Sequence, residues 1–152
     1  MLMPQPIAKV YIHAIFSTKN RDPVLAESWR DELFRVLSGT LNILGCHCLI
    51  VGGVADHIHI LFQLDDSVAI TGAIEKIKWT SSEWINQTRG LRLPFYWQNR
   101  YAAFSISQSD VESVREYIRG QSDYHAIQSF QDELREFFKR HEIKWDEANV
   151  WS

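Results

Sequence analysis

The spacing of apolar residues changes along the chain, and each change marks a predicted element. Residues 10–16 are rich in β-branched and aromatic side chains, which predicts a strand. From Glu27 to Leu41 apolar residues recur with helical spacing, and Gly45 ends this predicted helix. Two apolar runs follow at 46–51 and 57–64. The loop at 52–56 between them is typical of a hairpin.

The second half of the chain continues with two helix starts and one strand. Residues 65–67 have the chemistry to cap a helix whose apolar face runs from Ile70 to Ile85, and a strand is predicted at 101–106. Ser109 and Glu112 have capping-box spacing and predict a third helix that reaches about Tyr124. Ser129 starts another. The order β-α-β-β-α-β with C-terminal helices predicts an α+β, ferredoxin-like (RRM-like) fold, an antiparallel sheet with helices on one face.

Length and composition limit the class of protein. With 152 residues, 45% of them hydrophobic and 23% charged, we expect one domain over residues 1–152 with its own core. No run approaches the roughly 20 apolar residues of a membrane span, and the first residues do not resemble a signal peptide. We therefore expect a cytoplasmic protein with no membrane partner. Cys46 and Cys48, without a second pair, predict neither a disulfide framework nor a structural zinc site.

The formal net charge of −3 conceals two positive segments. Residues 1–30 carry four Lys/Arg against two Asp/Glu, and residues 66–100 carry five against three. A polyanion would meet these two segments, where Trp79, Trp97 or Tyr101 could also stack on unpaired bases. The alternative is that the cations form a solvated face and the tryptophans lie in the core. The candidate nucleic-acid contacts are Lys19, Arg21, Lys76, Lys78 and Arg100.

Two histidines are candidates for metal ligands. His57 and His59 are two residues apart in a predicted strand, so both project from one face, while Ile58 and Ile60 take the other. If the apolar side meets the helices, the imidazoles stand on a face that the helices leave open. Neutral imidazoles suit a divalent metal, but two ligands do not make a site, and a structural role is an equally good interpretation.

The third predicted helix offers further candidates. Tyr117 and Gln121 are four residues apart, about 40° around a helix, and share a stripe beside its apolar edge. Alternatively, Tyr117 is a partly buried aromatic with its hydroxyl in water. Gly120 lies inside this helix at a cost of roughly 1 kcal/mol relative to alanine, which indicates close approach of a partner or local looseness.

Taken in order, these motifs resemble those of a known family, the small single-tyrosine transposases of the HUH superfamily, including the REP-associated tyrosine transposase group. Those enzymes mobilise DNA as single strands. The resemblance runs from the first strand to the C-terminus, and its motifs are Phe16–Arg21, Asp56–Leu61, Trp97–Gln98, Tyr101–Ser107, Tyr117–Gln121, and Ile143–Glu147 with Trp151.

The resemblance implies a site and a reaction. His57 and His59 would be the metal pair, Gln121 the third protein ligand and Tyr117 the nucleophile, with Mg²⁺ or Mn²⁺ as cofactor. The reaction would cut and rejoin single-stranded DNA at hairpins through a 5′-phosphotyrosine, and the protein would be a homodimer. A tyrosine with a reference pKa near 10 is a poor nucleophile at neutral pH unless a base or a charged electrophile assists it, and such a metal can assist by polarising the phosphate. The family's usual His-His pair is replaced here by Tyr124-His125, which leaves the role of His125 open.

A second departure and three alternative functions remain. Arg100 stands where the family commonly has a glycine. A domesticated relative acting on repeated palindromes would share the same chemistry. A noncatalytic module that binds single-stranded nucleic acid would have structural histidines. A small zinc hydrolase using His57, His59 and a thiolate is the least favoured alternative, because the cysteines lie on another strand.

Overall fold

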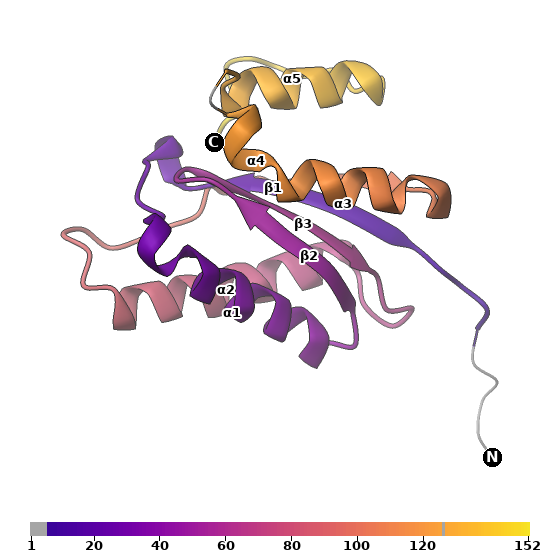
Figure 1. Cartoon of the computed structure of the whole chain (residues 1–152), viewed down its shortest axis with the longest axis horizontal. Helices are drawn as coiled ribbons and strands as arrows, with labels where there is room; N and C mark the ends of the chain where they lie inside the picture. Colours follow the sequence, from indigo (N-terminus) through magenta and orange to yellow (C-terminus); the bar gives the residue numbers. More distant parts are fainter. Residues whose placement is uncertain (1–5, 126) are drawn as a thin grey trace.

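A four-stranded sheet forms the centre of the protein. The computed structural model describes residues 6–125 and 127–152. The strands are β1 (Tyr11–Ser17), β2 (His47–Gly53), β3 (His57–Gln63) and β4 (Ala102–Ile106). Their order is β2-β3-β1-β4, and each neighbouring pair is antiparallel (Figure 1). This is the predicted ferredoxin-like arrangement, and it places β3 in the middle of the sheet.

Helices α1 (Glu27–Ile43) and α2 (Ile70–Thr88) pack on one face of the sheet (Figure 1). Alternate residues of β1 and β3, including Phe16, Ile58 and Ile60, join these helices in one apolar core. The predicted start of the second helix was wrong. Residues 65–67 form a separate turn, in which the Asp65 carboxylate accepts a hydrogen bond from the backbone N–H of Ser67, and α2 begins at Ile70.

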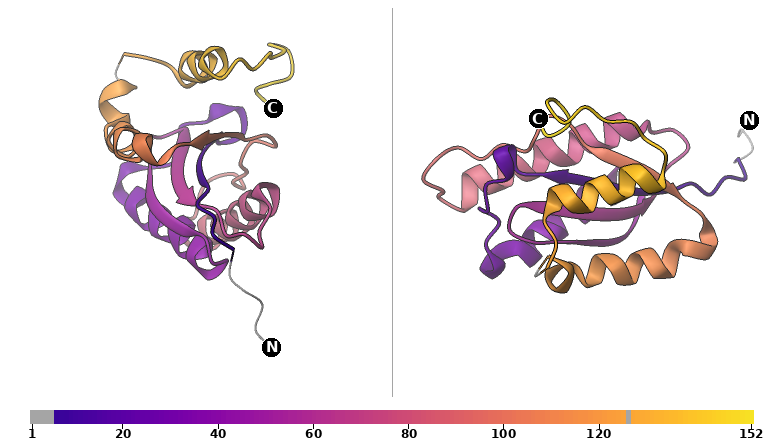
Figure 2. Two further views of the ribbon diagram at one scale, coloured as in Figure 1. Left: turned by 90° about the vertical axis from the view of Figure 1, so that its right-hand side faces the viewer. Right: turned by 90° about the horizontal axis from the view of Figure 1, so that it is seen from above.

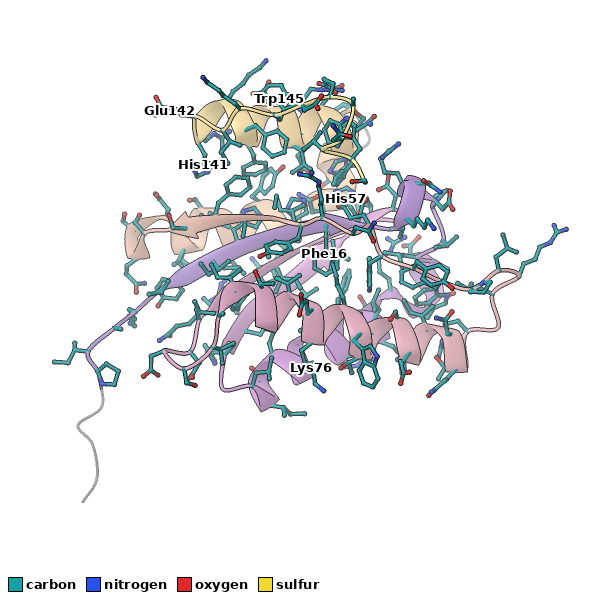
Figure 3. The ribbon with its side chains drawn as sticks, turned by 180° about the vertical axis from the view of Figure 1, so that it is seen from behind. Phe16, His57, Lys76, His141, Glu142 and Trp145 are labelled. Atoms are coloured by element: carbon teal, nitrogen blue, oxygen red, sulfur yellow. The ribbon has the colours of Figure 1, made fainter. Side chains whose placement is uncertain are left out.

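The C-terminal helices cover the opposite face. In Figure 2, seen from above, α5 (Phe130–Arg140) crosses over the sheet, and α3 (Val111–Arg119) runs along its β2 side. Because of these helices, the histidine face is closed rather than open, and both His57 and His59 are fully buried. Figure 3 shows Phe16 on the α2 side of the sheet and His57 on the α5 side.

The predicted third helix is interrupted. It ends at Arg119, and a short α4 (Gln121–Tyr124) follows Gly120, whose backbone leaves helical geometry (φ −91°, ψ 17°). Its predicted capping box does not form: a single 3₁₀ turn, η2 (Gln108–Asp110), precedes α3, and Asp110 is the N-cap residue without a side-chain cap bond. The start of α5 is as predicted, because the Ser129 side chain accepts a hydrogen bond from the N–H of Asp132.

A glycine on β2 allows α3 to approach the sheet. A Cβ atom at Gly52 would lie 2.6 Å from the carbonyl oxygen of Ile118, closer than real Cβ contacts come. Any larger residue would push α3 away from the sheet, and with it Tyr117. None of the helices within residues 6–125 and 127–152 is both long enough and apolar enough to cross a bilayer.

Candidate metal centre and nucleophile

Both β3 histidines are oriented by a second side chain. The Nδ1 atom of His57 lies 2.7 Å from Oδ1 of Asp56, and Nδ1 of His59 lies 2.8 Å from Nε2 of His13 on β1. Each Nε2 atom is therefore the one that faces α5. A partner on one ring nitrogen fixes which nitrogen is free to bind a metal, as is usual for metal-binding histidines.

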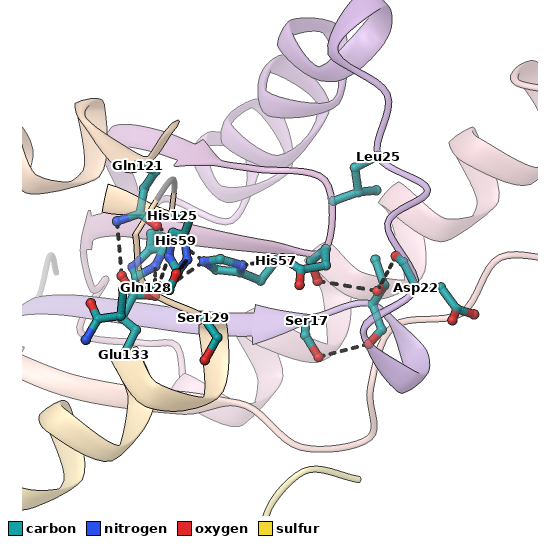
Figure 4. A network of polar contacts seen from close by, with 12 residues as sticks. Ser17, Asp22, Leu25, His57, His59, Gln121, His125, Gln128, Ser129 and Glu133 are labelled. Carbon is teal, nitrogen blue, oxygen red and sulfur yellow. Dashed lines mark hydrogen bonds and ion pairs between the residues drawn. The ribbon is translucent and has the colours of Figure 1, made fainter. Parts of the chain in front are cut away.

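Glu133 of α5 projects into the space between the histidines (Figure 4). Its Oε1 atom lies 3.0 Å from Nε2 of His59, 3.3 Å from Nε2 of His57 and 3.0 Å from Nε2 of His125. The ligand atoms of these four residues all lie within 4.8 Å of one another. Three imidazole nitrogens and one carboxylate form a donor set that suits a divalent metal ion.

The electrostatics of this cluster keep the carboxylate ionised. Burial by itself would raise the pKa of Glu133, but hydrogen bonds from His125, His57 and His59 hold that pKa well below its ordinary value. Burial would also lower the pKa of His57, yet Asp56 and Glu133 raise it. Burial lowers the pKa of His59. The pair thus combines one histidine biased toward the charged form with one biased toward the neutral form.

Tyr117 and Gln121 reach the same carboxylate. The Tyr117 hydroxyl donates a hydrogen bond to Oε2 of Glu133, and Nε2 of Gln121 donates to the same oxygen over 3.3 Å. Oε1 of Gln121 lies 3.2 Å from Nε2 of His57. The structure therefore brings all four residues predicted for the site together within one chain, despite the break at Gly120.

Glu133 and His125 were not assigned to the site from the sequence. A signal for Glu133 exists, because it lies beside Leu134 on a helix stripe that also holds Phe130 and Phe137, and a buried acid on an apolar stripe needs a partner. For His125, the sequence offered only its position after Tyr124.

The predicted nucleic-acid contacts lie in several places. Lys19 and Arg21 are in the 3₁₀ turn η1 (Lys19–Arg21) that follows β1, and the preceding Thr18 donates its backbone N–H to the carbonyl of Asp56. This turn is therefore next to the His57 end of the site. Lys76 lies on α2 with its ammonium 5.2 Å from the ring centre of Trp79, and Arg100 is exposed before β4.

Lys78 is occupied by backbone groups. Its Nζ donates hydrogen bonds to the carbonyl oxygens of Gln98 (2.8 Å) and Arg100 (2.9 Å). Burial lowers the pKa of Lys78 to about 8. These contacts give Lys78 a structural role beside any contact with DNA.

The three aromatic candidates differ in exposure. Trp97 is buried and donates its indole N–H to Oγ of Ser81, so the interpretation of Trp97 as a base platform was wrong. Trp79 is 59% exposed. Tyr101 is partly buried and shares a hydrogen bond with Thr71. Trp79 is therefore the one of the three that is free to stack on a base.

The cysteines are separate from the metal cluster. Both thiols are free, and burial raises the pKa of Cys48 to about 12, which disfavours a thiolate. The described residues that group as metal ligands include neither Cys46 nor Cys48. This geometry gives no support to the zinc hydrolase alternative.

Comparison with known proteins identifies the family. The sequence profile of the family described as "Transposase IS200 like" matches residues 6–121. The chain belongs to this family of IS200-like transposases. The matched segment contains His57, His59, Tyr117 and Gln121 and stops before His125 and Glu133. A search of curated proteins finds none that matches the sequence.

Two solved structures share the fold of this IS200-like transposase. One is a Deinococcus radiodurans protein inferred to be a transposase, with a TM-score of 0.63 and 21% identity over 80% of this chain and 98% of the other. The second is a REP-associated tyrosine transposase bound to a REP hairpin, with a TM-score of 0.60 and 16% identity over 82% of this chain and 74% of the other. At these identities the likeness concerns the fold.

Proposed function

We propose that this protein is a metal-dependent tyrosine transposase that cuts and rejoins single-stranded DNA at hairpin-marked ends. One observation carries the proposal: a single buried carboxylate, Glu133, contacts the two histidines of β3, the Tyr117 hydroxyl and Gln121. An ordinary buried histidine pair would need no tyrosine at the same point. Family membership supports transposition as the overall activity.

A divalent cation, Mg²⁺ or Mn²⁺, fits this cluster. His57, His59, His125 and Glu133 would hold it, with Nε2 atoms of the histidines as nitrogen ligands. Gln121, the third ligand that the family resemblance implies, lies beside them with Oε1 3.2 Å from Nε2 of His57 and stays a further candidate ligand. When bound, such an ion polarises a phosphate and orients it for in-line attack. Asp56 and His13 keep the two imidazoles turned toward it.

Tyr117 would be the nucleophile. Its oxygen forms a bond to the scissile phosphorus while the bond from phosphorus to the 3′-oxygen breaks, which leaves a 5′-phosphotyrosine and a free 3′-hydroxyl. Oε2 of Glu133 accepts the hydrogen bond of the phenol and orients its oxygen. Because the pKa of this carboxylate lies well below its ordinary value, the phenol's proton passes to solvent, and the departing 3′-oxygen takes one up. The phosphotyrosine bond conserves the energy for rejoining, so the reaction needs no ATP.

The η1 turn is the best candidate for the surface that contacts the DNA strand where it enters the site. Asn20 and Arg21 both have left-handed backbones, with φ of 58° and 59°. Such a conformation costs on the order of 1–3 kcal/mol for a residue like arginine, and strain of this kind clusters at functional sites. The turn lies at the end of the sheet where His57 is, because Thr18 bonds the carbonyl of Asp56, and the Lys19 ammonium lies 5.4 Å from the ring centre of Tyr96. We infer that Lys19 and Arg21 contact the DNA backbone, with Lys76, Lys78 and Arg100 as more distant contacts.

Hairpin recognition and assembly are inferred from the relatives. The REP-associated relative is bound to a REP hairpin, which supports a hairpin substrate, either an element end or a genomic repeat. Tyr117 reaches the cluster of its own chain, which supports cleavage within one subunit. The expected homodimer would then serve to hold two DNA ends. We infer that residues 1–152 act as one catalytic domain.

The test is covalent capture. The protein is incubated with a pool of hairpin-bearing single-stranded DNA and Mn²⁺, and adducts are mapped by mass spectrometry. We expect a phosphodiester on Tyr117 that disappears with EDTA or in Tyr117→Phe and persists in the control Tyr11→Phe. DNA binding without any adduct, in Mg²⁺ or Mn²⁺, would favour the noncatalytic module instead.

A further inference from the structure

A cavity lies beside Tyr117, and none of the four clustered ligand residues lines it. Its volume is about 330 Å³, and it is bounded by α3, the outer strand β4 and the C-terminal end of α5. Ligand sites in proteins range from roughly 300 to 1,000 Å³, so this cavity has room for one nucleotide and not for a duplex. The polar side chains that line it are His13, Ser105, Ser113, Tyr117, Arg140 and His141, with Asp110.

His13 forms part of the cavity wall and has an unused polar atom. Its side chain is 1% exposed, and its Nε2 is occupied by His59. Its Nδ1 is buried with no hydrogen-bond partner among the residues that the structure describes. Buried polar atoms in native proteins are nearly always paired, so an unpaired one beside a cavity points to a ligand group that is still to come.

Arg140 and His141 close the other end of the cavity. The guanidinium of Arg140 lies 5.3 Å from the ring centre of Phe137, and the His141 ring stacks on Phe104 with ring centres 4.4 Å apart. Within the described parts of the chain, Arg140 has no acidic partner. The acid on this wall, Asp110, accepts a hydrogen bond from the Ser107 hydroxyl. The aromatic packing holds both side chains in place and leaves the charge of Arg140 available.

We propose that this cavity is a phosphate subsite that holds the DNA nucleotide next to the cleaved bond. The proposal rests on the function argued above and adds a second contact region for the same strand. Arg140 and the Ser105 hydroxyl would bind the phosphate oxygens. Because His59 donates its Nε2–H to the Glu133 carboxylate, its Nδ1 accepts from Nε2 of His13, which leaves Nδ1 of His13 as an acceptor. This Nδ1 would take a hydrogen bond from an N–H of the nucleotide's base. Because Tyr117 lines both this cavity and the metal cluster, a strand seated here passes the nucleophile.

The experiment measures reversible binding of the full chain in EDTA, where no cleavage occurs. The probes are a seven-nucleotide oligothymidylate and inorganic phosphate alone. In Arg140→Ala we expect oligonucleotide affinity to fall about tenfold, as for loss of a hydrogen bond to a charged group. We expect the slope of log affinity against log salt to become shallower by about 0.7, the value for one phosphate contact on a single strand.

The matched control is Lys139→Ala. It removes the same charge from the neighbouring residue, whose side chain lines a different hollow with Ile127 and Glu136. Its affinity should change less than twofold, and Asp110→Asn should tighten binding. Equal losses in Arg140→Ala and Lys139→Ala would overturn the subsite. So would loss of inorganic phosphate binding with unchanged oligonucleotide affinity, since the ligand would then be free phosphate.

Failure of this proposal is distinct from failure of the function itself. The affinity measurement requires neither metal nor an adduct on Tyr117. An Arg140-dependent affinity without any adduct would keep the subsite and remove the transposase chemistry. An adduct with unchanged affinity in Arg140→Ala would do the reverse.

Discussion

The two faces of the sheet are equally buried but are held together in different ways. On β3, Ile58 and Ile60 point into the core under α1 and α2, while His57 and His59 point toward α5, and all four are 0% exposed. The first face is apolar and is stabilised by packing, in proportion to the area removed from water. The second face buries imidazoles and a carboxylate, which cost free energy unless each is paired.

This difference separates folding from function. The apolar face needs only shape and volume, and its residues serve the stability of the whole domain. The polar face is satisfied by specific partners, with Asp56 on His57, His13 on His59 and Glu133 between them. Changes on the first face should lower the free energy of unfolding and leave metal affinity intact. Changes on the second face should mainly lower metal affinity.

The largest effect is expected on the apolar face. Ile60→Ala removes a fully buried side chain and should lower the free energy of unfolding by about 2–5 kcal/mol, whereas Ile60→Val should cost about 0.5–1.5 kcal/mol. Denaturant unfolding measures both values. Mn²⁺ affinity of the folded fraction should stay within twofold. A large loss of metal affinity in Ile60→Val would show that the two faces are coupled.

The next effect concerns metal binding on the polar face. Glu133→Gln keeps the size of the side chain and removes the charge between the histidines, so Mn²⁺ affinity should fall about 100-fold, at the upper end of losses around metal sites. Calorimetric titration gives the affinity. The control is Glu136→Gln, an exposed acid on the same helix, which should change affinity less than twofold. If both variants bind equally well, Glu133 is not a ligand.

A smaller loss is expected when a histidine loses its orienting partner. His13→Phe keeps a ring in place but removes the nitrogen 2.8 Å from His59, and Mn²⁺ affinity should fall about tenfold. His13→Asn, which retains a polar atom, should recover part of the loss. If His13→Phe lowers only the free energy of unfolding and leaves metal affinity intact, His13 serves packing alone.

Local geometry predicted which site residues share a face, whereas their roles as metal ligands and nucleophile were assigned from the family resemblance. Two histidines in alternate positions of a strand must share a face, so His57 and His59 needed no tertiary information. The pairing of His59 with Glu133 joins residues 74 positions apart and depends on α5 folding back over the sheet. The spacing of apolar residues cannot predict a contact between segments so far apart in the sequence. For this reason the closed face and the role of the Glu133 carboxylate were not predicted.

The bounds of two helices were predicted wrongly, because the same residues can form either a helix or a turn. The spacing of Tyr117 and Gln121 predicted one helix, but the glycine between them let the backbone turn, and both side chains still meet at Glu133. Residues 65–67 are good caps, yet Asp65 bonds Ser67 within its own turn instead of starting α2. Both errors concern where a helix begins or ends, and neither changes the predicted order of strands and helices.

The smallest effect is an acid transition of the C-terminal tail, whose Trp145 and Trp151 pack against α5. Glu147 accepts hydrogen bonds from Arg135 and from the indoles of Trp145 and Trp151, which lower its pKa to about 2. Because the folded pKa lies below the ordinary 4.5, this carboxylate stabilises the docked tail above pH 4.5, and the contribution is lost as the pH falls toward 2. Tryptophan fluorescence should report this change. Glu147→Gln should remove it and leave Mn²⁺ affinity at neutral pH unchanged. An identical acid transition in both proteins would mean that another carboxylate controls the tail.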